Sequence, residues 1–522
     1  MSINSHIINE DFLEKPIKTK KVKDPSVEKP IKAKKIKDPS VEKPKKNIDI
    51  SKLKTFINRE GYILNKTNIN TSLIDSVKKD LTVTPHQTFK PPNVKPVIFK
   101  VYSENDTYIS IPKFYGIKKF GKADEDLIEP GKCIDIKFNS NLKPNQVEIT
   151  NKTITHIDRT NGGLICVGCG VGKTVMGLYI ACHYKVKTLI IVHKTFLLNQ
   201  WKERIEQFTN ARIGIIQQSN IDVEDKDIVI GMLQSIARDK YDRDIFMDFG
   251  LVIFDEAHHA PSEYFSKALP IIGCKLSLGL SATPKRADKM EKILYWYLGE
   301  IAYSAPPNKN ENVLVRAYNY ECNNPMFKES RMYTGDVNRA KTINNITGID
   351  LRNNFIVDRI QEILLEEPNR KILILSDRIE HLDILKINID KFIKIPNKVI
   401  TCEYYIGGMK QSKLDQASEA NIILGSYGMA SEGLDIPSLN TLIMATPRRE
   451  VEQSIGRIIR KVGEVQPLII DIIDMLPSFA NQGIHRRKLY KNLNYQIDVY
   501  NNTTKVEIYN EPNDNIELDF ID

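Results

Sequence analysis

The feature that most constrains the fold is an apolar run that enters a glycine-rich turn and then a helix-forming stretch, Leu164-Ile-Cys-Val-Gly-Cys-Gly-Val-Gly-Lys-Thr174. A buried strand followed by such a turn lets backbone N–H groups and a helix N-terminus surround a polyphosphate. Lys173 is then expected to meet the β- and γ-phosphates, and Thr174 to ligate Mg²⁺. The run therefore predicts an α/β domain that binds a nucleoside triphosphate, with a phosphate loop formed by Gly168, Cys169, Gly170, Val171 and Gly172.

A second apolar strand, Leu251-Val-Ile-Phe254, follows roughly eighty residues later and ends in Asp255 and Glu256. Asp255 is suited to hold the same Mg²⁺ through water, and Glu256 to orient the attacking water. The strict spacing rule for phosphate loops asks for a glycine where this chain has Val167. An ordinary glycine-rich turn of an α/β protein is the alternative. The acidic pair at the expected distance favours a site that hydrolyses the nucleotide.

The composition excludes several other classes of protein. A length of 522 residues allows about three domains, and no apolar run approaches the ~20 residues of a membrane-spanning helix. The first residues lack the apolar core of a secretion signal. Seven scattered cysteines form no disulfide framework, which predicts a reducing, intracellular compartment. Cys166 and Cys169 have no second cysteine or histidine pair that could complete a metal site, so we interpret them as structural.

The net charge of +9 is weak evidence for a nucleic-acid partner. The first fifty residues contain 13 lysines and 8 acids, a surplus of +5 that leaves about +4 for the other 472 residues. A nucleic-acid groove must therefore be a local feature of a nearly neutral globular part.

Two segments precede the α/β region. Residues 1–50 repeat a Lys/Pro-rich unit and are expected to be a disordered basic tail, either an arm for nucleic acid or a nuclear address, or, as we favour, a solvated tail without a specific role. Residues 51–125 are expected to form a small α+β accessory domain, with a helix near 72–79 and strands at 95–102 and 107–112. Four aromatic residues here could stack on bases, although a core role is favoured: Tyr102, Tyr108, Phe114 and Tyr115.

Short β-branched strands then alternate with helical stretches in two successive regions, 126–305 and 306–480. This alternation predicts parallel sheets with crossover helices. The expected strands are 163–167, 188–192, 227–230, 251–254 and 276–280 in the first region, and 371–375, 421–424, 441–444 and 467–470 in the second. Residues 481–522 are left as a C-terminal extension without an interpretation.

Only the first region has a phosphate loop, so the second is expected to supply charges that complete the site. Gln453-Ser-Ile-Gly-Arg-Ile-Ile-Arg460 provides them if it is helical, because Gln453, Arg457 and Arg460 then share one face. Arginine suits a γ-phosphate because its planar fork donates several hydrogen bonds and keeps its charge. A surface helix with two arginines is the alternative.

With these motifs the chain resembles superfamily 2 helicases of the DEAH-box kind, over roughly residues 138–478. The resemblance implies two tandem RecA-like lobes, ATP and Mg²⁺ as cofactors, and ATP hydrolysis coupled to movement on nucleic acid. It assigns adenine reading to Gln146 and the coupling of hydrolysis to movement to His258, Ser281, Thr283, Gly433 and Asp435. Three segments resemble family elements that contact the nucleic-acid backbone: 192–201, 231–235 and 374–378.

Within the superfamily, Gly-Cys-Gly-Val-Gly-Lys-Thr, Leu-Leu-Asn-Gln-Trp and Ser-Ala-Thr-Pro-Lys-Arg resemble the XPB-like branch, and segments 79–85 and 102–115 look most like its members from large DNA viruses. Gly168 stands where the family usually has Pro or Ala, which is expected to soften the loop. The resemblance favours DNA over RNA as the substrate and implies a place beside transcription or replication machinery, with no membrane; for a viral protein the expected location is the host cytoplasm or the virion.

Four alternatives to a strand-separating DNA helicase stay open. They are a duplex translocase that releases transcripts without separating strands, an RNA helicase, a non-catalytic nucleic-acid-binding scaffold, and the ATPase subunit of a restriction-like complex.

Overall fold

The computed structural model describes residues 55–85, 98–168, 170–238, 240–257, 262–282, 289–305, 312–432, 434, 436–459 and 465–509. The tail expected at residues 1–50 lies outside the described residues. No helix in the described ranges combines the length and the apolar character needed to cross a bilayer.

The accessory domain is a five-stranded sheet with two helices. Its strand order is β5-β6-β2-β1-β7, from β5 (Ser103–Glu104), β6 (Tyr108–Ile111), β2 (Gly61–Asn65), β1 (Thr55–Asn58) and β7 (Glu125–Asp126). The predicted helix is confirmed as α1 (Thr71–Asp80), where Asn70 caps the first turn and Leu73, Ile74 and Val77 form the buried face. The second helix is α2 (Lys113–Phe120), and β3 (Thr82–Val83) pairs with β4 (Phe99–Lys100). The strand predicted at 107–112 is confirmed by β6. Of the strand predicted at 95–102, the structure describes residues 98–102, which contain β4.

The accessory domain shares a hydrophobic core with the first lobe, which follows it in the chain. Arg59 donates hydrogen bonds to the carbonyls of Phe246 at 2.9 Å and Ile272 at 3.2 Å. The ammonium group of Lys113 donates to the carbonyl of Lys275 at 2.8 Å. These contacts join the two parts through backbone acceptors as well as apolar packing.

The first lobe is an eight-stranded sheet in the order β11-β10-β12-β9-β13-β14-β8-β15, parallel except for the β10–β11 pair. The strands are β8 (Gly162–Cys166), β9 (Thr188–Val192), β10 (Ile213–Gln217), β11 (Asn220–Ile221), β12 (Ile228–Met232), β13 (Leu251–Phe254), β14 (Leu276–Ser281) and β15 (Ile301–Ser304). All five strands expected in this region are present, because each is a buried, nearly continuous apolar run.

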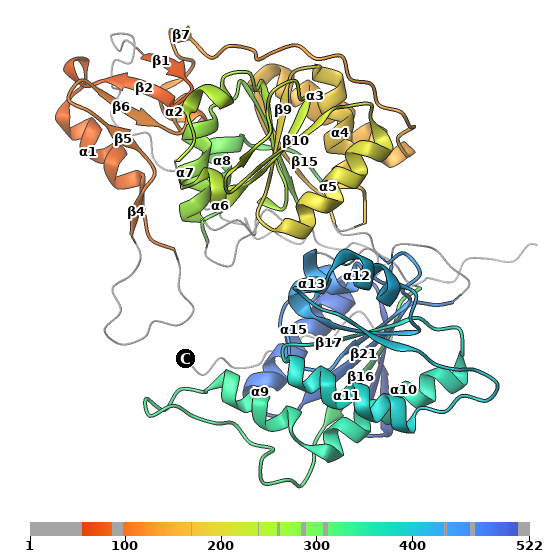
Figure 1. Ribbon diagram of the computed structural model, residues 1–522. Helices are drawn as coiled ribbons and strands as arrows, with labels where there is room; N and C mark the ends of the chain where they lie inside the picture. The colour runs from red at the N-terminus through yellow and green to blue at the C-terminus, as the bar shows by residue number, and fades with distance from the viewer. Residues whose placement is uncertain are drawn as a thin grey trace, which may run out of the picture. The chain divides into compact units, whose positions relative to one another are not determined.

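Helices cover both faces of this sheet (Figure 1). Successive strand residues point to opposite faces, so Ile165, Ile190 and Ile253 pack with one set of helices and Leu164, Leu189 and Val252 with the other. The first set is α3 (Pro144–Thr160), α4 (Lys173–Tyr184) and α5 (Thr195–Phe208); the second is α6 (Leu233–Ile236), α7 (Ser262–Ile272) and α8 (Glu291–Leu298). The arrangement is a doubly wound α/β lobe.

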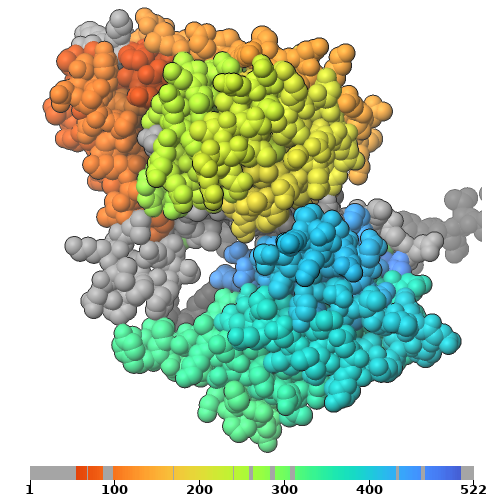
Figure 2. Space-filling model, viewed as in Figure 1, coloured from red at the N-terminus to blue at the C-terminus, as the bar shows by residue number. Residues whose placement is uncertain are grey.

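The second lobe has its own eight-stranded sheet, in the order β18-β19-β17-β20-β21-β16-β22-β23. Its strands are β16 (Leu314–Tyr320), β17 (Ile372–Ser376), β18 (Cys402–Tyr405), β19 (Ile422–Ser426), β20 (Thr441–Met444), β21 (Leu468–Asp474), β22 (Gln496–Asn501) and β23 (Thr504–Tyr509). All neighbours are parallel except β22 and β23. Its helices are α9 (Arg339–Thr347), α10 (Asp350–Glu366), α11 (Ile379–Phe392), α12 (Gln411–Ser418), α13 (Tyr427–Glu432), α14 (Glu452–Ile455) and α15 (Pro477–Asn492). The surface of this lobe is coloured from green-blue to blue in the space-filling view (Figure 2). The chain thus has the two parallel-sheet, RecA-like lobes that the sequence predicts.

The segment expected as a C-terminal extension is part of the second lobe as far as it is described. The boundary placed at residue 480 falls inside α15, and β22 pairs with β16 in parallel. Tyr490 and Tyr495 are buried in the lobe's core. Likewise, the boundary placed at 125 falls inside β7 of the accessory sheet.

Two buried ion pairs anchor the last strand-helix unit of this lobe. Arg352 donates to both carboxylate oxygens of Asp474, at 2.6 and 2.8 Å, and both side chains are fully buried. Arg486 makes an equivalent pair with Asp471, which also accepts a hydrogen bond from the hydroxyl of Tyr490 at 3.0 Å. These contacts tie β21 to α10 and α15.

Candidate active site

The predicted nucleotide site lies at the carboxyl ends of three neighbouring strands. In the sheet, β13 pairs with β14, and β14 pairs with β8. The register sets Ser281 beside Cys166 and Phe254 beside Gly279. The acids after β13 and the phosphate loop after β8 therefore leave the sheet at the same edge, which is where open parallel sheets bind ligands.

The phosphate loop has the backbone conformation that its glycines permit. Gly170 and Gly172 have φ values of +83° and +93°, and Gly172 caps the N-terminus of α4. These left-handed conformations are disfavoured for residues with a Cβ. Gly168 is different, because a Cβ added there meets nothing within 4 Å. Cys169 lies outside the described residues.

Lys173 and Thr174 are the first two residues of α4. The Lys173 side chain is buried, and its ammonium group donates to the carbonyl of Val167 at 3.3 Å and lies 3.9 Å from Glu256 Oε1. Thr174 is half-buried. Both residues sit at the helix N-terminus, where backbone N–H groups and the helix dipole favour an anion.

Gln146, the residue predicted to read adenine, contacts the phosphate loop. Its side chain is buried at the third position of α3. Oε1 accepts a hydrogen bond from the backbone N–H of Lys143 at 2.9 Å, and Nε2 donates to the carbonyl of Val171 at 2.8 Å. Gln146 therefore joins the start of α3 to the loop.

The two acids after β13 have different surroundings. Asp255 is buried, and its carboxylate accepts from the indole N–H of Trp201 at 2.7 Å and from the backbone N–H of Glu256 at 3.0 Å. Glu256 is half-buried and has a φ of +44°. Burial raises the pKa of the Asp255 carboxyl above its usual value, and the neighbouring charge of Glu256 raises it further. Two close carboxylates near a single lysine fit a divalent cation, so this donor set, with the hydroxyl of Thr174, is compatible with Mg²⁺.

Of the predicted coupling residues, the structure describes Ser281. It ends β14 fully buried, and its carbonyl accepts a hydrogen bond from the N–H of Val167, at the start of the phosphate loop, at 3.1 Å. The remaining coupling residues, His258, Thr283, Gly433 and Asp435, lie outside the described residues.

The predicted helix from Gln453 to Arg460 is wrong in its length. Helix α14 ends at Ile455, and the next residues form turns around Gly456, a poor helix former. Arg457 is buried in these turns, and its Nε donates to the carbonyl of Ala430 in α13 at 2.7 Å. Gln453 lies on α14 and is half-buried, whereas Arg460 lies outside the described residues.

Two contacts in the first lobe were missed by the sequence interpretation. Trp201 belongs to a segment assigned to nucleic-acid contact, yet its indole reaches Asp255. The side-chain amide of Gln234 donates to the carbonyl of His193 at 2.7 Å, which joins two of the segments that resemble strand-contacting elements. The glutamine and tryptophan were visible in the sequence, but their partners lie 41 and 54 residues away.

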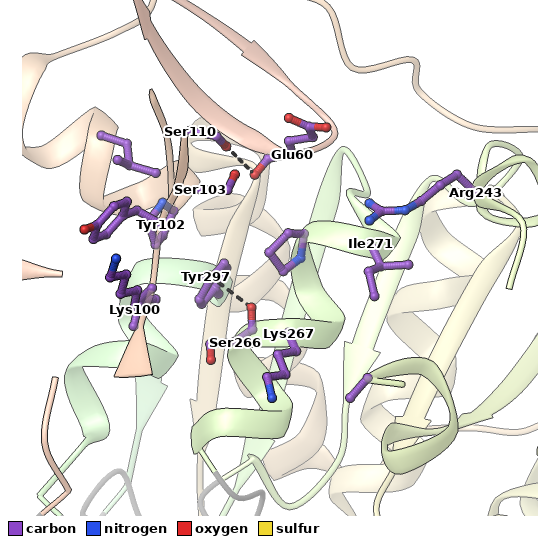
Figure 3. A pocket seen from close by; sticks show the side chains of 15 residues that line it. Glu60, Lys100, Tyr102, Ser103, Ser110, Arg243, Ser266, Lys267, Ile271 and Tyr297 are labelled. Atoms are coloured by element: carbon purple, nitrogen blue, oxygen red, sulfur yellow. Dashed lines mark hydrogen bonds between the residues drawn. The ribbon is translucent and has the colours of Figure 1, made fainter. Parts of the chain in front are cut away.

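A hollow of about 410 Å³ lies where the accessory domain meets the first lobe (Figure 3). Its lining includes Lys100 and Tyr102 from the accessory domain, and Arg243, Lys267 and Tyr297 from the first lobe. The other aromatics of the predicted stacking platform are dispersed. Tyr115 is buried against Trp296, with ring centroids 5.4 Å apart, and Tyr108 packs edge-on against Phe56. The core interpretation therefore holds for Tyr115.

The described residues hold no group of three or more His, Cys, Asp or Glu side chains that could bind a metal on their own. Cys166 is buried, and burial raises the pKa of its thiol to about 11, so the neutral thiol persists at neutral pH.

Comparison with known proteins places this geometry in a family. Residues 139–286 match the family model "Type III restriction enzyme, res subunit", and residues 356–462 match "Helicase conserved C-terminal domain". A protein of Acanthamoeba polyphaga mimivirus that is named an ATP-dependent RNA helicase is 39% identical over 462 residues, which cover 86% of this chain and 88% of the relative.

More distant relatives also come from large DNA viruses. A protein of invertebrate iridescent virus 6, named a helicase, is 25% identical over 82% of this chain and 97% of its own length. A protein of African swine fever virus, named an ATP-dependent RNA helicase, is 29% identical over 63% of this chain and 68% of its own length. The structure of phage T4 UvsW matches 86% of this chain and 99% of its own length, with 18% identity and a TM-score of 0.35. The extended match to the mimivirus protein and the two matched domains show that the chain belongs to the superfamily 2 helicases, nucleic-acid-dependent ATPases, and to the type found in large DNA viruses.

Proposed function

We propose that this helicase hydrolyses ATP with Mg²⁺ at the carboxyl edge of the first sheet and uses the reaction to move along DNA. The observation that carries the proposal is the proximity of Lys173 to Glu256, with Asp255 beside them, at the N-terminus of α4. A basic side chain, a buried carboxylate and the N–H groups of a helix N-terminus are the set that phosphoryl transfer to water requires.

Each residue is assigned a step on this basis. Lys173 leaves the carbonyl of Val167 and binds the β- and γ-phosphates, with the N–H groups of the loop around them. Thr174 and Asp255 hold Mg²⁺, which when bound neutralises phosphate charge. Glu256 orients the attacking water and accepts its proton.

The second lobe supplies the remaining charges. Arg457 and Arg460 stabilise the charge on the γ-phosphate in the transition state, and Gln453 assists in positioning it. Gln146 reads adenine. The coupling residues His258, Ser281, Thr283, Gly433 and Asp435 transmit the change in nucleotide state to the segments that hold the strand. Contacts with the phosphodiester backbone position the strand and do not read its sequence.

DNA is the proposed substrate because the loop, Leu-Leu-Asn-Gln-Trp and Ser-Ala-Thr-Pro-Lys-Arg segments resemble the XPB-like branch. RNA is the second candidate, supported by the names of the mimivirus and African swine fever virus relatives. The proposed context is viral transcription, replication or repair, with either strand separation or translocation on duplex as the motor activity.

The test is ATP turnover by the full chain alone and with single-stranded DNA, duplex DNA or RNA, with Lys173→Ala as the control. Stimulation by DNA that exceeds stimulation by RNA supports the proposal, and the reverse order selects the RNA helicase. Strand displacement measured beside displacement of a bound block from duplex separates unwinding from translocation. Arg457→Ala is expected to lower turnover by about a thousandfold while nucleotide binding persists.

A further inference from the structure

Trp201 makes an unusual contact for a buried aromatic residue. It lies on α5 with 1% of its surface exposed, in a stripe with Leu197, Leu198 and Ile205 that packs on the sheet. Its indole N–H donates to Asp255 Oδ2 at 2.7 Å. Since an indole N–H is only a donor, the bond fixes which group accepts. This contact joins α5 to the carboxylate proposed to hold Mg²⁺.

The second oxygen of that carboxylate is also held. Asp255 Oδ1 accepts the N–H of Glu256 at 3.0 Å, so one hydrogen bond on each oxygen sets the rotation of the carboxylate plane. Each oxygen keeps a lone pair for a metal ion or its water. The donors therefore orient Asp255 without using up its capacity to bind a cation.

The ring of Trp201 is itself held in place by the helix that follows the phosphate loop. A Cβ added at Gly177 of α4 would lie 3.3 Å from the tip of the indole and 3.2 Å from the side chain of Leu280. Glycine at this position lets the ring lie against α4 while its N–H reaches Asp255. Trp201 thus contacts α4, which carries Thr174, and Asp255, which directly follows β13.

We propose that Trp201 is a positioning residue that aims the Asp255 carboxylate at the metal, and that this bond links the segment of α5 to the nucleotide site. The inference rests on the proposed function, because it takes Asp255 as a metal ligand. Partners that orient a metal ligand through a hydrogen bond typically change metal affinity 10- to 100-fold when removed. The same scale is expected for the loss of this indole donor.

The test compares two substitutions in the full chain. Trp201→Phe keeps an aromatic ring and removes the N–H, whereas Trp201→His keeps a ring N–H donor. The measurement is the Mg²⁺ concentration that half-saturates binding of a fluorescent ADP analogue, followed by anisotropy, with thermal unfolding as a check that each variant is folded. Trp296→Phe is the matched control, because Trp296 is the chain's other tryptophan and packs against Tyr115.

For Trp201→Phe we expect the half-saturating Mg²⁺ concentration to rise at least tenfold. For Trp201→His we expect this concentration to lie within about threefold of the wild-type value. The control is expected to match the wild type. An unchanged Mg²⁺ dependence in folded Trp201→Phe would overturn the proposal. An equal defect in both Trp201 variants would also overturn it, since the ring volume would then be the cause. Failure of the proposed function is distinct, because the wild type itself would then show no Mg²⁺-dependent nucleotide binding.

A second measurement follows the surroundings of the Trp201 indole by fluorescence. In Trp296→Phe the remaining tryptophan is Trp201, so emission excited at a wavelength that tyrosine does not absorb reports on this indole alone. Adding Mg²⁺ with ADP is expected to shift that emission with the same half-saturation as nucleotide binding, and Asp255→Asn is expected to abolish the shift. If the emission does not change with Mg²⁺ while the nucleotide binds, the result would contradict a hydrogen bond from Trp201 to a ligand of the metal.

Discussion

The side-chain amide of Gln146 lies so close to Gly172 that a Cβ at Gly172 would stand 2.4 Å from its nitrogen. Any side chain there would have to displace an amide that is held by the carbonyl of Val171 and, through its oxygen, by the N–H of Lys143. The shape of the phosphate loop thus depends on a helix that begins 28 residues earlier, at Pro144.

Gly172→Ala is therefore expected to abolish nucleotide binding, because the new methyl group meets Gln146 and the backbone φ of +93° disfavours alanine. Gly168→Ala is the matched control. It has open space around the new Cβ, so binding is expected to stay within about twofold and stability to rise by about 0.5 kcal/mol. Anisotropy of a fluorescent ADP analogue checks both. Equal effects of the two substitutions on nucleotide binding would contradict the assignment of the phosphate-binding conformation to Gly172.

Gln146→Ala is expected to weaken ATP and GTP binding by about tenfold alike through the loop, since a buried hydrogen bond is worth about 1 to 2 kcal/mol. Adenine reading by Gln146 predicts an additional loss confined to ATP. Competition binding with ATP and GTP separates the two roles. Glu148→Gln, in an exposed pair with Lys152 on the same helix, is the control and is expected to bind like the wild type.

The ammonium group of Lys113 is expected to make the stability of the junction between the accessory domain and the first lobe depend on pH. Burial lowers the pKa of this ammonium group from 10.5 to about 8. The negative charge of Asp126, which pairs with Lys275 at 2.7 Å, acts in the opposite direction and raises the pKa. The unfolded chain therefore binds more protons than the folded chain between pH 8 and 10.5, so stability rises with pH in that window. Between pH 8 and 9.5, the free energy of unfolding of the wild type is expected to rise by about 1.5 kcal/mol more than that of Lys113→Met. Urea unfolding followed by tryptophan emission measures this, because Trp201 and Trp296 both lie in the first lobe. A parallel pH response of the two proteins would contradict it.

The buried pair of Arg352 and Asp474 predicts a large loss on substitution. Arg352→Met leaves the Asp474 carboxylate buried without its cation and is expected to cost about 3–5 kcal/mol. Arg316→Met is the comparison, because its partner Glu366 is half exposed, and it is expected to cost about 1 kcal/mol or less. Amide hydrogen exchange in β16 and β21 measures the stability of the second lobe separately from that of the first. Similar exchange in the two variants would show that burial of the pair matters little.

The sequence predicts the strands that are continuous apolar runs, and β9, β13 and β20 begin and end where the runs do. It also predicts the site where chemistry follows directly from the local chain, as at Lys173 and Asp255. It misses β16, because both of its partners, β21 and β22, lie more than 150 residues away along the chain. It also misses β22, which pairs with the distant β16 as well as with the neighbouring β23. The Trp201–Asp255 bond is missed for a similar reason. A tryptophan at helical spacing from leucines indicates a core position, and nothing local reveals its acceptor.

The position of β16 has a consequence for how the protein is made. This first strand of the second lobe lies between β21 and β22, with Leu314 paired to Leu468 on one side and to Gln496 on the other. During synthesis the ribosome releases β16 long before either neighbour exists, while the strands of the first lobe are already complete. The second lobe must therefore remain unfinished, with an apolar strand lacking its partners, until nearly all of residues 1–501 have been translated. Chaperone demand during translation is expected to concentrate on that interval.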